Sequence, residues 1–380
     1  SQEAVIKVIG VGGCGGNAIE HMITKNLNGV EFICANTDMQ ALKKSNAGTV
    51  LQIGSEITKG LGAGAKPEIG RDAALEDRDR IAEAIEGADM LFITAGMGGG
   101  TGTGAGPIIA EVAKEMGILT VAVVTKPFAF EGKRTKVAAD GLEELSQHVD
   151  SLIVIPNEKL MEVLGEDVPF LEAFRAANDV LHNAVSGIAE IINCPGLVNV
   201  DFADVRTVMS EMGMAMMGSA EASGPERARI AAEQAVASPL LEDVNLANAR
   251  GVLINITASS SFKMKEYYDV MNTIKEFTAE DATVIVGNVM DESMGDRLRV
   301  TMVATGLNGT IARRQQKPEL RVMTTLMTGT NSQPVFVDSG MEDETPAVFS
   351  QNNRRAQVEA MKMSGVEEYD IPAFLRKQAD

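Results

Sequence analysis

The sequence has no tryptophan, and aromatic residues make up only 4% of its 380 residues. It contains no apolar run of about 18 residues, so we expect no membrane-spanning helix. The three cysteines, Cys14, Cys34 and Cys194, have neither disulfide pairing nor the spacing of metal ligands, which suits a reducing compartment. Residues 1–3 show no basic start of a signal peptide. These absences exclude disulfide scaffolds and membrane bundles, and they predict a cytosolic protein.

Glycine and acidic side chains are abundant instead. The chain has 37 glycines and is 45% hydrophobic, which is typical of a globular α/β protein of two or three domains. Its 53 acidic and 34 basic residues give a net charge of −19. Such a field repels nucleic acids and anionic lipid, so we expect neither nucleic-acid binding nor direct membrane insertion. A phosphate ligand would need backbone N–H groups, helix N-termini and a divalent cation.

Apolar strand-like runs alternate with helical periodicity over residues 4–168. This alternation predicts an α/β fold with a doubly wound, mostly parallel sheet. The expected strands span 4–10, 30–36, 90–95, 118–125 and 152–156. The expected helices span 17–28, 67–86, 104–116 and 133–148.

The pattern changes after this region. Residues 169–193 have apolar positions at helical spacing, and Pro195-Gly196 follows just after them, so we expect a central helix within 169–195. Residues 196–309 predict a second, smaller α+β domain. Its last two strands, 282–290 and 298–306, follow each other without a helix between them, which indicates an antiparallel or mixed sheet.

The C-terminal segment divides into two parts. Residues 310–366 are too poor in apolar side chains to fold, and we expect a disordered linker. Residues 367–380 concentrate apolar side chains again, which is typical of a peptide that docks on a partner. The docking side chains would be Tyr369, Asp370, Ile371, Pro372, Phe374 and Leu375.

A glycine-rich loop follows the first expected strand. Residues 10–16 read GVGGCGG and lead into a helix, so the backbone can approach a phosphate closely. Alone, this loop also fits a dinucleotide site with Asp38 as the ribose-binding acid. The sequence has no GxxxxGK[ST] motif, which excludes an ordinary P-loop.

A second glycine loop follows the strand at 90–95. Residues 96–104 read GMGGGTGTG and again precede a helix. Such a run suits a nest of N–H donors around phosphate oxygens. Two loops of this kind on neighbouring strand ends predict a polyphosphate held mainly by backbone, and a dehydrogenase would not need the second.

These motifs resemble those of the tubulin/FtsZ family, and in particular its FtsZ members. The stretch GGGTGTG at 98–104 is the shared signature. The resemblance extends over nearly the whole chain except the linker. The other matching segments are VIGVGGCGGNA at 8–18, AVVTKPFAFEGKR at 122–134, AFRAANDVL at 173–181, NVDFADVRTVMSEMG at 199–213 and YDIPAFLRKQAD at 369–380.

The resemblance implies a site for GTP or GDP, with Mg²⁺ held mainly through phosphates and water. It assigns the phosphate and sugar contacts to Gly12, Gly13, Cys14, Gly15, Asn17, Asn36, Asp38, Gly64, Gly98, Gly99, Gly100, Thr101, Gly102, Thr103, Glu131 and Arg134. Phe174, Asn178 and Asp179 would contact the base. A carboxylate at Asp179 can accept from N1–H and N2–H₂ of guanine, which favours GTP over ATP. Without the glycine loops, Asn178 and Asp179 would read as polar residues on an exposed helix face.

Asn199, Asp201 and Asp204 precede or begin an expected helix. On residue types alone, Asp201 reads as an N-cap and Asp204 as a first-turn acid. The resemblance implies instead that all three enter the nucleotide site of an adjoining subunit and orient the attacking water.

The resemblance therefore predicts a self-assembling GTPase that forms head-to-tail protofilaments of the bacterial division ring. It implies a location at mid-cell on the inner face of the membrane, with the terminal peptide docked on the tethers FtsA and ZipA. Two alternatives stay open: a Rossmann-type nicotinamide oxidoreductase, and a GTP-binding regulator that does not polymerise.

Overall fold

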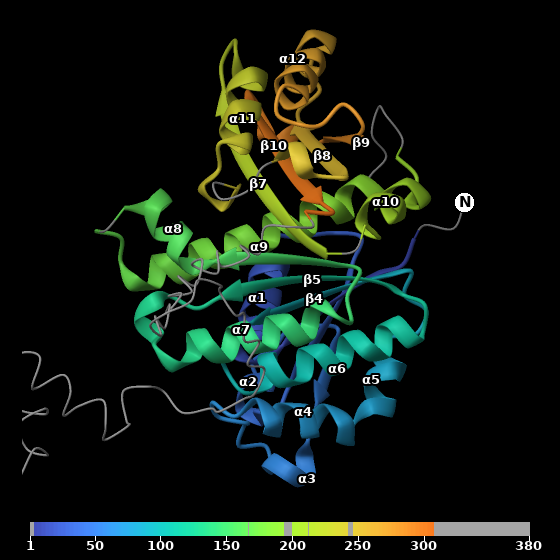
Figure 1. The fold of residues 1–380 in the computed structure, drawn as a ribbon, viewed down its shortest axis with the longest axis vertical. Coiled ribbons are helices and arrows are strands. Elements are labelled where there is room, and N and C mark those ends of the chain that lie inside the picture. The colour runs from blue at the N-terminus through green and yellow to red at the C-terminus, as the bar shows by residue number, and fades with distance from the viewer. Residues whose placement is uncertain (1–3, 166, 194–199, 212, 242–245, 308–380) are drawn as a thin grey trace, which may run out of the picture. The chain divides into compact units, whose positions relative to one another are not determined.

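The computed structural model describes residues 4–165, 167–193, 200–211, 213–241 and 246–307, and Figure 1 shows them as a ribbon. The expected linker at 310–366 and docking peptide at 367–380 lie outside the described residues, as does Asn199.

The strands of the described residues form one sheet of ten. They are β1 (Ile6–Val11), β2 (Glu31–Asn36), β3 (Thr49–Gln52), β4 (Met90–Gly96), β5 (Leu119–Lys126), β6 (Ser151–Pro156), β7 (Gly213–Ser223), β8 (Gly251–Ala258), β9 (Thr283–Met290) and β10 (Arg297–Thr305). Their order is β3-β2-β1-β4-β5-β6-β7-β10-β8-β9. The first six pair in parallel, which confirms the doubly wound, mostly parallel sheet. The strand order reverses between β1 and β4, where such sheets bind ligands.

Helices cover both faces of this sheet. They are α1 (Gly12–Thr24), α2 (Met39–Leu42), α3 (Ser55–Thr58), α4 (Pro67–Glu76), α5 (Arg78–Ile85), α6 (Thr101–Glu115), α7 (Lys133–Ser146), α8 (Asn157–Leu164), α9 (Phe170–Asn193), α10 (Phe202–Met209), α11 (Arg227–Val236) and α12 (Met264–Lys275). Short 3-10 turns are η1 (Ala129–Glu131), η2 (Pro239–Leu241), η3 (Leu246–Asn248) and η4 (Glu292–Met294). Figure 1 shows α6 and α7 in front of the parallel strands.

Side chains alternate between two cores along each parallel strand, as the period of two requires. On β1, Ile6 and Val8 pack with α1 and α9, whereas Ile9 and Val11 pack with α4 to α7 on the other face. All four side chains are essentially buried. The sheet is therefore covered on both faces and leaves its carboxyl-terminal edge for a ligand.

The second half of the chain adds a mixed sheet. β10 is antiparallel to β7 and β8, and β8 is parallel to β9, in agreement with the expected α+β pattern. α11 and α12 pack on one face through a third core. β7 also pairs with β6 through three residue pairs, from Ser151–Gly213 to Ile153–Ala215, so the sheet is continuous. The division into domains at 168 and 196 stays a prediction.

Two sequence-based expectations about helices were wrong. The helices after the glycine loops begin inside the loops, at Gly12 and Thr101, not at residues 17 and 104. The single helix expected over 67–86 is interrupted at Asp77. The buried carboxylate of Asp77 accepts from Gly54 N (2.7 Å) and from Arg80 (2.8 Å). A partner 23 residues away in the sequence explains why local periodicity missed this break.

The α4–α6 contact depends on a glycine. A Cβ on Gly104 would lie 1.9 Å from the carbonyl oxygen of Pro67 and 2.6 Å from the nitrogen of Arg71. We expect Gly104→Ala to lower the free energy of unfolding by about 2 kcal/mol, because the helices must move apart. Urea unfolding followed by circular dichroism measures this.

Gly106 on the same helix is the matched control. A Cβ on Gly106 would meet no atom within 4 Å, so Gly106→Ala should be neutral or stabilise by up to about 1 kcal/mol. Equal unfolding midpoints for the two variants would contradict the close packing of α4 on α6.

Candidate nucleotide-binding site

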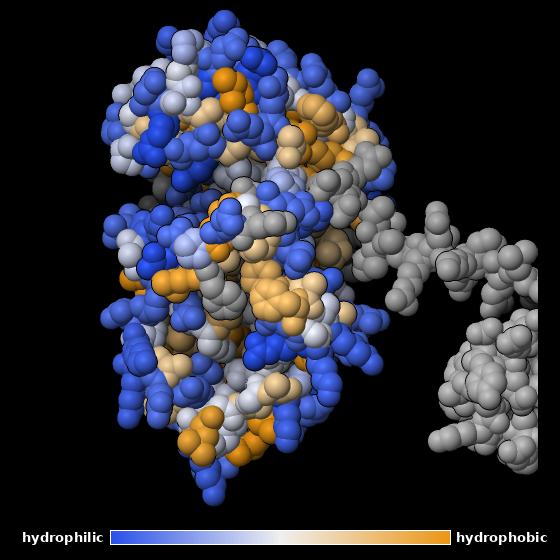
Figure 2. All heavy atoms as spheres, turned by 90° about the vertical axis from the view of Figure 1, so that its left-hand side faces the viewer, coloured by the Kyte–Doolittle hydropathy of each residue, from blue (hydrophilic) through white to orange (hydrophobic). Residues whose placement is uncertain are grey.

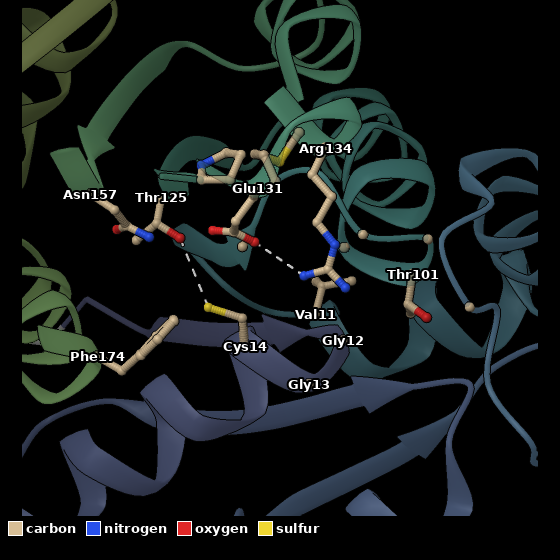
Figure 3. Close-up of a pocket in the computed structure, with 17 residues that line it drawn as sticks. Val11, Gly12, Gly13, Cys14, Thr101, Thr125, Glu131, Arg134, Asn157 and Phe174 are labelled. Carbon is tan, nitrogen blue, oxygen red and sulfur yellow. Dashed lines mark hydrogen bonds and ion pairs between the residues drawn. The ribbon is translucent and has the colours of Figure 1, made fainter. Parts of the chain in front are cut away.

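A pocket lies where the strand order reverses, at the carboxyl ends of β1 and β4 (Figure 3). Its volume is about 260 Å³, close to the lower end for small-molecule sites. The first glycine loop contributes Gly12, Gly13 and Cys14 to its lining. The loop between α3 and α4 contributes Gly64. The second loop contributes Gly99, Gly100, Thr101 and Gly102. The structure thus brings the two loops together around one space.

Uncapped helix ends point N–H groups at this space. The N-cap residues of α1 and α6 are Val11 and Gly100, and neither makes a side-chain capping bond. The first-turn N–H groups of both helices are therefore available to a ligand, and the helix dipoles favour an anion there. A Cβ on Gly13 or Gly99 would meet no atom within 4 Å, so the lining is open on that side. These features fit phosphate groups.

The segment around Gly64 is tied to the second loop. Gly100 N donates to the carbonyl oxygen of Gly64 (2.9 Å), and a Cβ on Gly100 would lie 2.5 Å from that oxygen. The hydroxyls of Thr37 and Thr101 are 2.7 Å apart. The loop at 62–64 is therefore in direct contact with the second glycine loop.

Glu131 and Arg134 are the charged side chains of the pocket lining. They form an ion pair, with Arg134 Nη1 3.2 Å from Glu131 Oε2, and Figure 3 shows both side chains over the pocket. Glu131 Oε1 also accepts from Phe128 N (3.0 Å). Glu131 is thereby fixed, while Arg134 is 58% exposed and can turn toward a phosphate.

Three residues of α9 were assigned to the base. Phe174 lines the pocket and packs edge-on against Phe128, with ring centroids 5.8 Å apart. Asn178 is half-buried, and neither it nor Asp179 lines the pocket. Asp179 Oδ1 is bound by His21 Nε2 (2.7 Å) and Lys25 Nζ (3.3 Å). Partial burial opposes ionisation of Asp179, but its bonds to His21 and Lys25 outweigh this and lower its pKa.

Four other assigned residues do not line the pocket: Gly15, Asn17, Gly98 and Thr103. A Cβ on Gly15 would lie 2.5 Å from the Thr94 carbonyl oxygen, so this glycine permits helix–strand contact. Gly98 N donates to Thr103 Oγ1 (2.8 Å). Asn17 is exposed on α1.

Asn36 and Asp38 likewise bond to local backbone. Asn36 is buried, and its Oδ1 accepts from Asp38 N (3.2 Å). Asp38 caps α2 by accepting from the nitrogens of Gln40 (2.8 Å) and Ala41 (3.3 Å). Neither side chain lines the pocket.

Sequence reasoning missed several lining residues. Thr125, Pro127 and Asn157 lie outside the two glycine loops, whereas Val11, Gly96 and Met97 belong to loops that were predicted but were not assigned individually. Thr125 lies near the end of β5, and its Oγ1 is 3.9 Å from Cys14 Sγ. Asn157 follows β6, and its buried Oδ1 has no hydrogen-bond partner in the described part of the chain. Their position at the carboxyl ends of parallel strands is the signal that could have found them.

Asp201 and Asp204 lie far from the pocket. Asp201 caps α10 by accepting from Asp204 N (2.8 Å), and both residues are exposed. Arg206 of the same helix donates to the carbonyl oxygen of Gly117 (3.3 Å), just before β5, at the amino-terminal edge of the sheet. The pocket occupies the opposite edge. In Figure 1, α8 and α10 lie at opposite ends of α9.

Metal sites and membrane spans are both absent from the described residues. No three His, Cys, Asp or Glu side chains come together there as a metal site. None of the helices described has both the length and the apolar character needed to cross a membrane.

The fold and the pocket define an α/β protein with two glycine loops and two uncapped helix starts around one space, an arrangement that suits the phosphates of a nucleotide. Two family models match the chain: the Tubulin/FtsZ family GTPase domain over residues 5–165 and the FtsZ family C-terminal domain over residues 213–308.

Relatives match over the whole chain. The cell division protein FtsZ of Pseudomonas aeruginosa is 58% identical and covers 100% of this chain and 98% of its own. The cell division protein FtsZ of Coxiella burnetii is also 58% identical, and the match covers 99% of this chain and 97% of that protein. An FtsZ dimer structure from M. jannaschii is 44% identical with a TM-score of 0.78, covering 81% of this chain and 89% of that one. CetZ2 from Haloferax volcanii, 19% identical with a TM-score of 0.67 over 80% and 93%, shares the fold.

The chain belongs to the tubulin/FtsZ family, as an FtsZ-type member. It is accordingly a GTPase of this family, and the two alternatives, an oxidoreductase and a non-polymerising regulator, are not supported.

Gly13 allows the pocket to be tested without disturbing the fold. A methyl group there meets no protein atom within 4 Å but occupies space beside the uncapped start of α1. We expect Gly13→Ala to weaken GTP binding by about tenfold, the loss of one charge-assisted hydrogen bond. Isothermal titration calorimetry measures this, with Gly106→Ala as the control. Unchanged GTP affinity would contradict the placement of phosphates at α1.

Proposed function

We propose that this protein is a self-assembling GTPase of bacterial cell division whose GTP is hydrolysed between two copies stacked head to tail. One observation carries this proposal: the nucleotide pocket and the two aspartates lie at opposite edges of the sheet. The stretch of α9 from Phe174, which lines the pocket, to Asn193 is roughly 28 Å long. The two halves cannot meet within one chain, but they can meet between copies.

In the proposed site, the pocket of one copy binds the nucleotide. The first-turn N–H groups of α1 and α6 hold the phosphates, and Arg134 turns toward them. Mg²⁺, held mainly by phosphates and water, would supply charge neutralisation. The residues present fit the phosphates of such an arrangement, because the first turns of α1 and α6 offer donors that no side chain caps.

The next copy would supply the carboxylates. Asp201, the N-cap of α10, and Asp204, in its first turn, are both exposed, so they can approach a neighbouring pocket without rearranging the core. There they would orient and polarise the water that attacks the γ-phosphate, with Asn199 of the same segment. Phosphoryl transfer depends on positioning and charge stabilisation, so assembly itself would activate hydrolysis.

Base selection is assigned to α9. Phe174 would contact the ring of the base, and Asn178 and Asp179 would read its edge. Guanine presents N1–H and N2–H₂ to a carboxylate, whereas adenine presents an acceptor at N1. An ionised Asp179 therefore favours GTP over ATP. The lowered pKa of Asp179 supports its being ionised at neutral pH.

The relatives support the assembly and the cellular role. The matching proteins of P. aeruginosa and C. burnetii are named cell division proteins, and the M. jannaschii structure is a dimer. We propose that this chain acts in the cytoplasm, in a mid-cell ring at the inner face of the membrane. Residues 367–380 would dock on tethers such as FtsA and ZipA; this part of the proposal rests on the sequence of the segment.

Mixing two variants tests the shared site. Gly13→Ala impairs the pocket, and Asp204→Asn impairs the carboxylates while leaving the Asp201 cap intact. We expect Asp204→Asn to lower GTP turnover by about a hundredfold without loss of GTP binding. In an equal mixture at subsaturating GTP, about a quarter of random head-to-tail junctions combine an intact pocket with intact carboxylates. Phosphate release should recover to a similar fraction of the parent rate.

Asp79→Asn is the matched control, since Asp79 is also an exposed acid in a first helical turn. It should leave turnover unchanged. The parent should show a threshold protein concentration followed by a steep rise in turnover per molecule. No recovery in the mixture, or the same turnover per molecule at every protein concentration, would defeat the shared site.

Deleting residues 367–380 tests the tail. We expect GTP turnover and assembly to persist, because the pocket and α10 lie in the described fold. Binding to FtsA and ZipA should be lost, as measured by co-sedimentation. Loss of GTP binding on deletion would show instead that the tail is part of the nucleotide site.

A further inference from the structure

Both α1 and α9 run from the pocket to the neighbourhood of Asp179. Cys14 and His21 lie on α1, and Lys25 is its C-cap residue; their spacings of seven and four place them along one face of the helix. Cys14 lines the pocket at the start of α1, and Phe174 lines it from α9 (Figure 3). Farther along, His21 and Lys25 both contact Asp179 of α9. The base is expected between these two helices.

The contacts on Asp179 are unequal between its two oxygens. His21 Nε2 lies 2.7 Å from Oδ1, and Lys25 Nζ lies 3.3 Å from the same Oδ1. A carboxylate oxygen has room for about two donors, so Oδ1 is saturated. Within the described residues, no hydrogen bond reaches Oδ2. The carboxylate thus has one oxygen fixed and one free to accept.

His21 is the better-defined of the two partners. Its side chain is 19% exposed, compared with 50% for Lys25. Its ring packs edge-on against His182, with centroids 6.4 Å apart and an interplanar angle of 82°. Burial and the nearby Arg299 lower the pKa of His182 to about 4, so at neutral pH His182 adds packing but no charge. His21 therefore has a fixed ring, whereas Lys25 has a long, half-exposed stem.

We propose that His21 is a positioning residue for base selection: it holds Asp179 by Oδ1 so that Oδ2 is presented to a purine with donors at N1 and at the 2-amino group. This inference rests on the proposed function, in which Asp179 reads the base. Lys25 supplies charge that keeps the carboxylate ionised. The ligand class is the guanine nucleotides; hypoxanthine, which lacks the 2-amino group, is the informative comparison.

Nucleoside diphosphates test the role of His21 on the full chain, because they bind without being hydrolysed. We would measure dissociation constants for GDP and inosine diphosphate by calorimetry. For His21→Ala we expect GDP binding to weaken by about tenfold and inosine diphosphate binding to weaken less, so that the preference for guanine falls several-fold. His21→Gln retains an N–H donor and should recover most of the preference.

One further variant, compared with His21→Ala, separates this inference from the proposed function. Asp179→Asn should abolish the preference for GDP; if the preference persists, Asp179 does not read the base and both proposals about it are wrong. If Asp179→Asn abolishes the preference while His21→Ala leaves the ratio of the two constants unchanged, base reading survives and positioning by His21 is overturned.

Structural damage has a different signature. Equal weakening of both diphosphates in His21→Ala would show that His21 contributes packing alone, and would overturn the proposal. Should His21→Ala fail to fold, His21→Gln decides: a preference kept within about twofold of the parent supports the donor role, and its loss overturns it. His148→Ala is the control, since His148 follows α7 at the end far from Arg134, and it should change neither constant.

Discussion

The nucleotide site depends on how closely backbone segments approach one another at glycines. A Cβ on Gly10 would lie 2.4 Å from the Gly15 carbonyl oxygen, and one on Gly100 would lie 2.5 Å from that of Gly64. Because no side chains stand at these crossings, α1 can begin at the residue after β1, and α6 can begin at Thr101, shortly after β4 ends at Gly96. Their free N–H groups then converge on one space, which a strand order reversing between β1 and β4 leaves uncovered.

The charge balance explains why the site is built from backbone. A chain with a net charge of −19 repels a polyphosphate at long range, and the charge of Arg134 is partly offset by Glu131 at 3.2 Å. Helix dipoles act within about one turn, whereas the net charge is screened beyond about 8 Å at physiological salt. In the proposed site, affinity would therefore come from local donor geometry, and small displacements of the loops would matter more than the surrounding charge.

The parallel sheet and both glycine loops could be predicted because buried strands and glycine runs are local signals. Features that depend on partners distant in the sequence could not be predicted. The helix break at Asp77 follows from the hydrogen bond between Asp77 and Gly54. The hydrogen bond that holds Asp179 comes from His21 of α1. Thr125 and Asn157 were missed because single polar residues at strand ends carry no motif of their own. Of the residues assigned from the family resemblance, those in the glycine loops mostly line the pocket, whereas Asn36 and Asp38 bond to nearby backbone.

The separation of the pocket and the aspartates along α9 has a consequence for a filament, that is, for a row of copies joined by the proposed contact. Such a row has two unlike ends. At one end the last pocket receives no acids from a neighbour, so the nucleotide there escapes cleavage and stays a triphosphate. At the other end the acids face solvent and act on nothing. In such a row the subunit with the open pocket would keep GTP, whereas the interior subunits would convert GTP to GDP with time. The nucleotide at each position would therefore show how long ago that subunit was added.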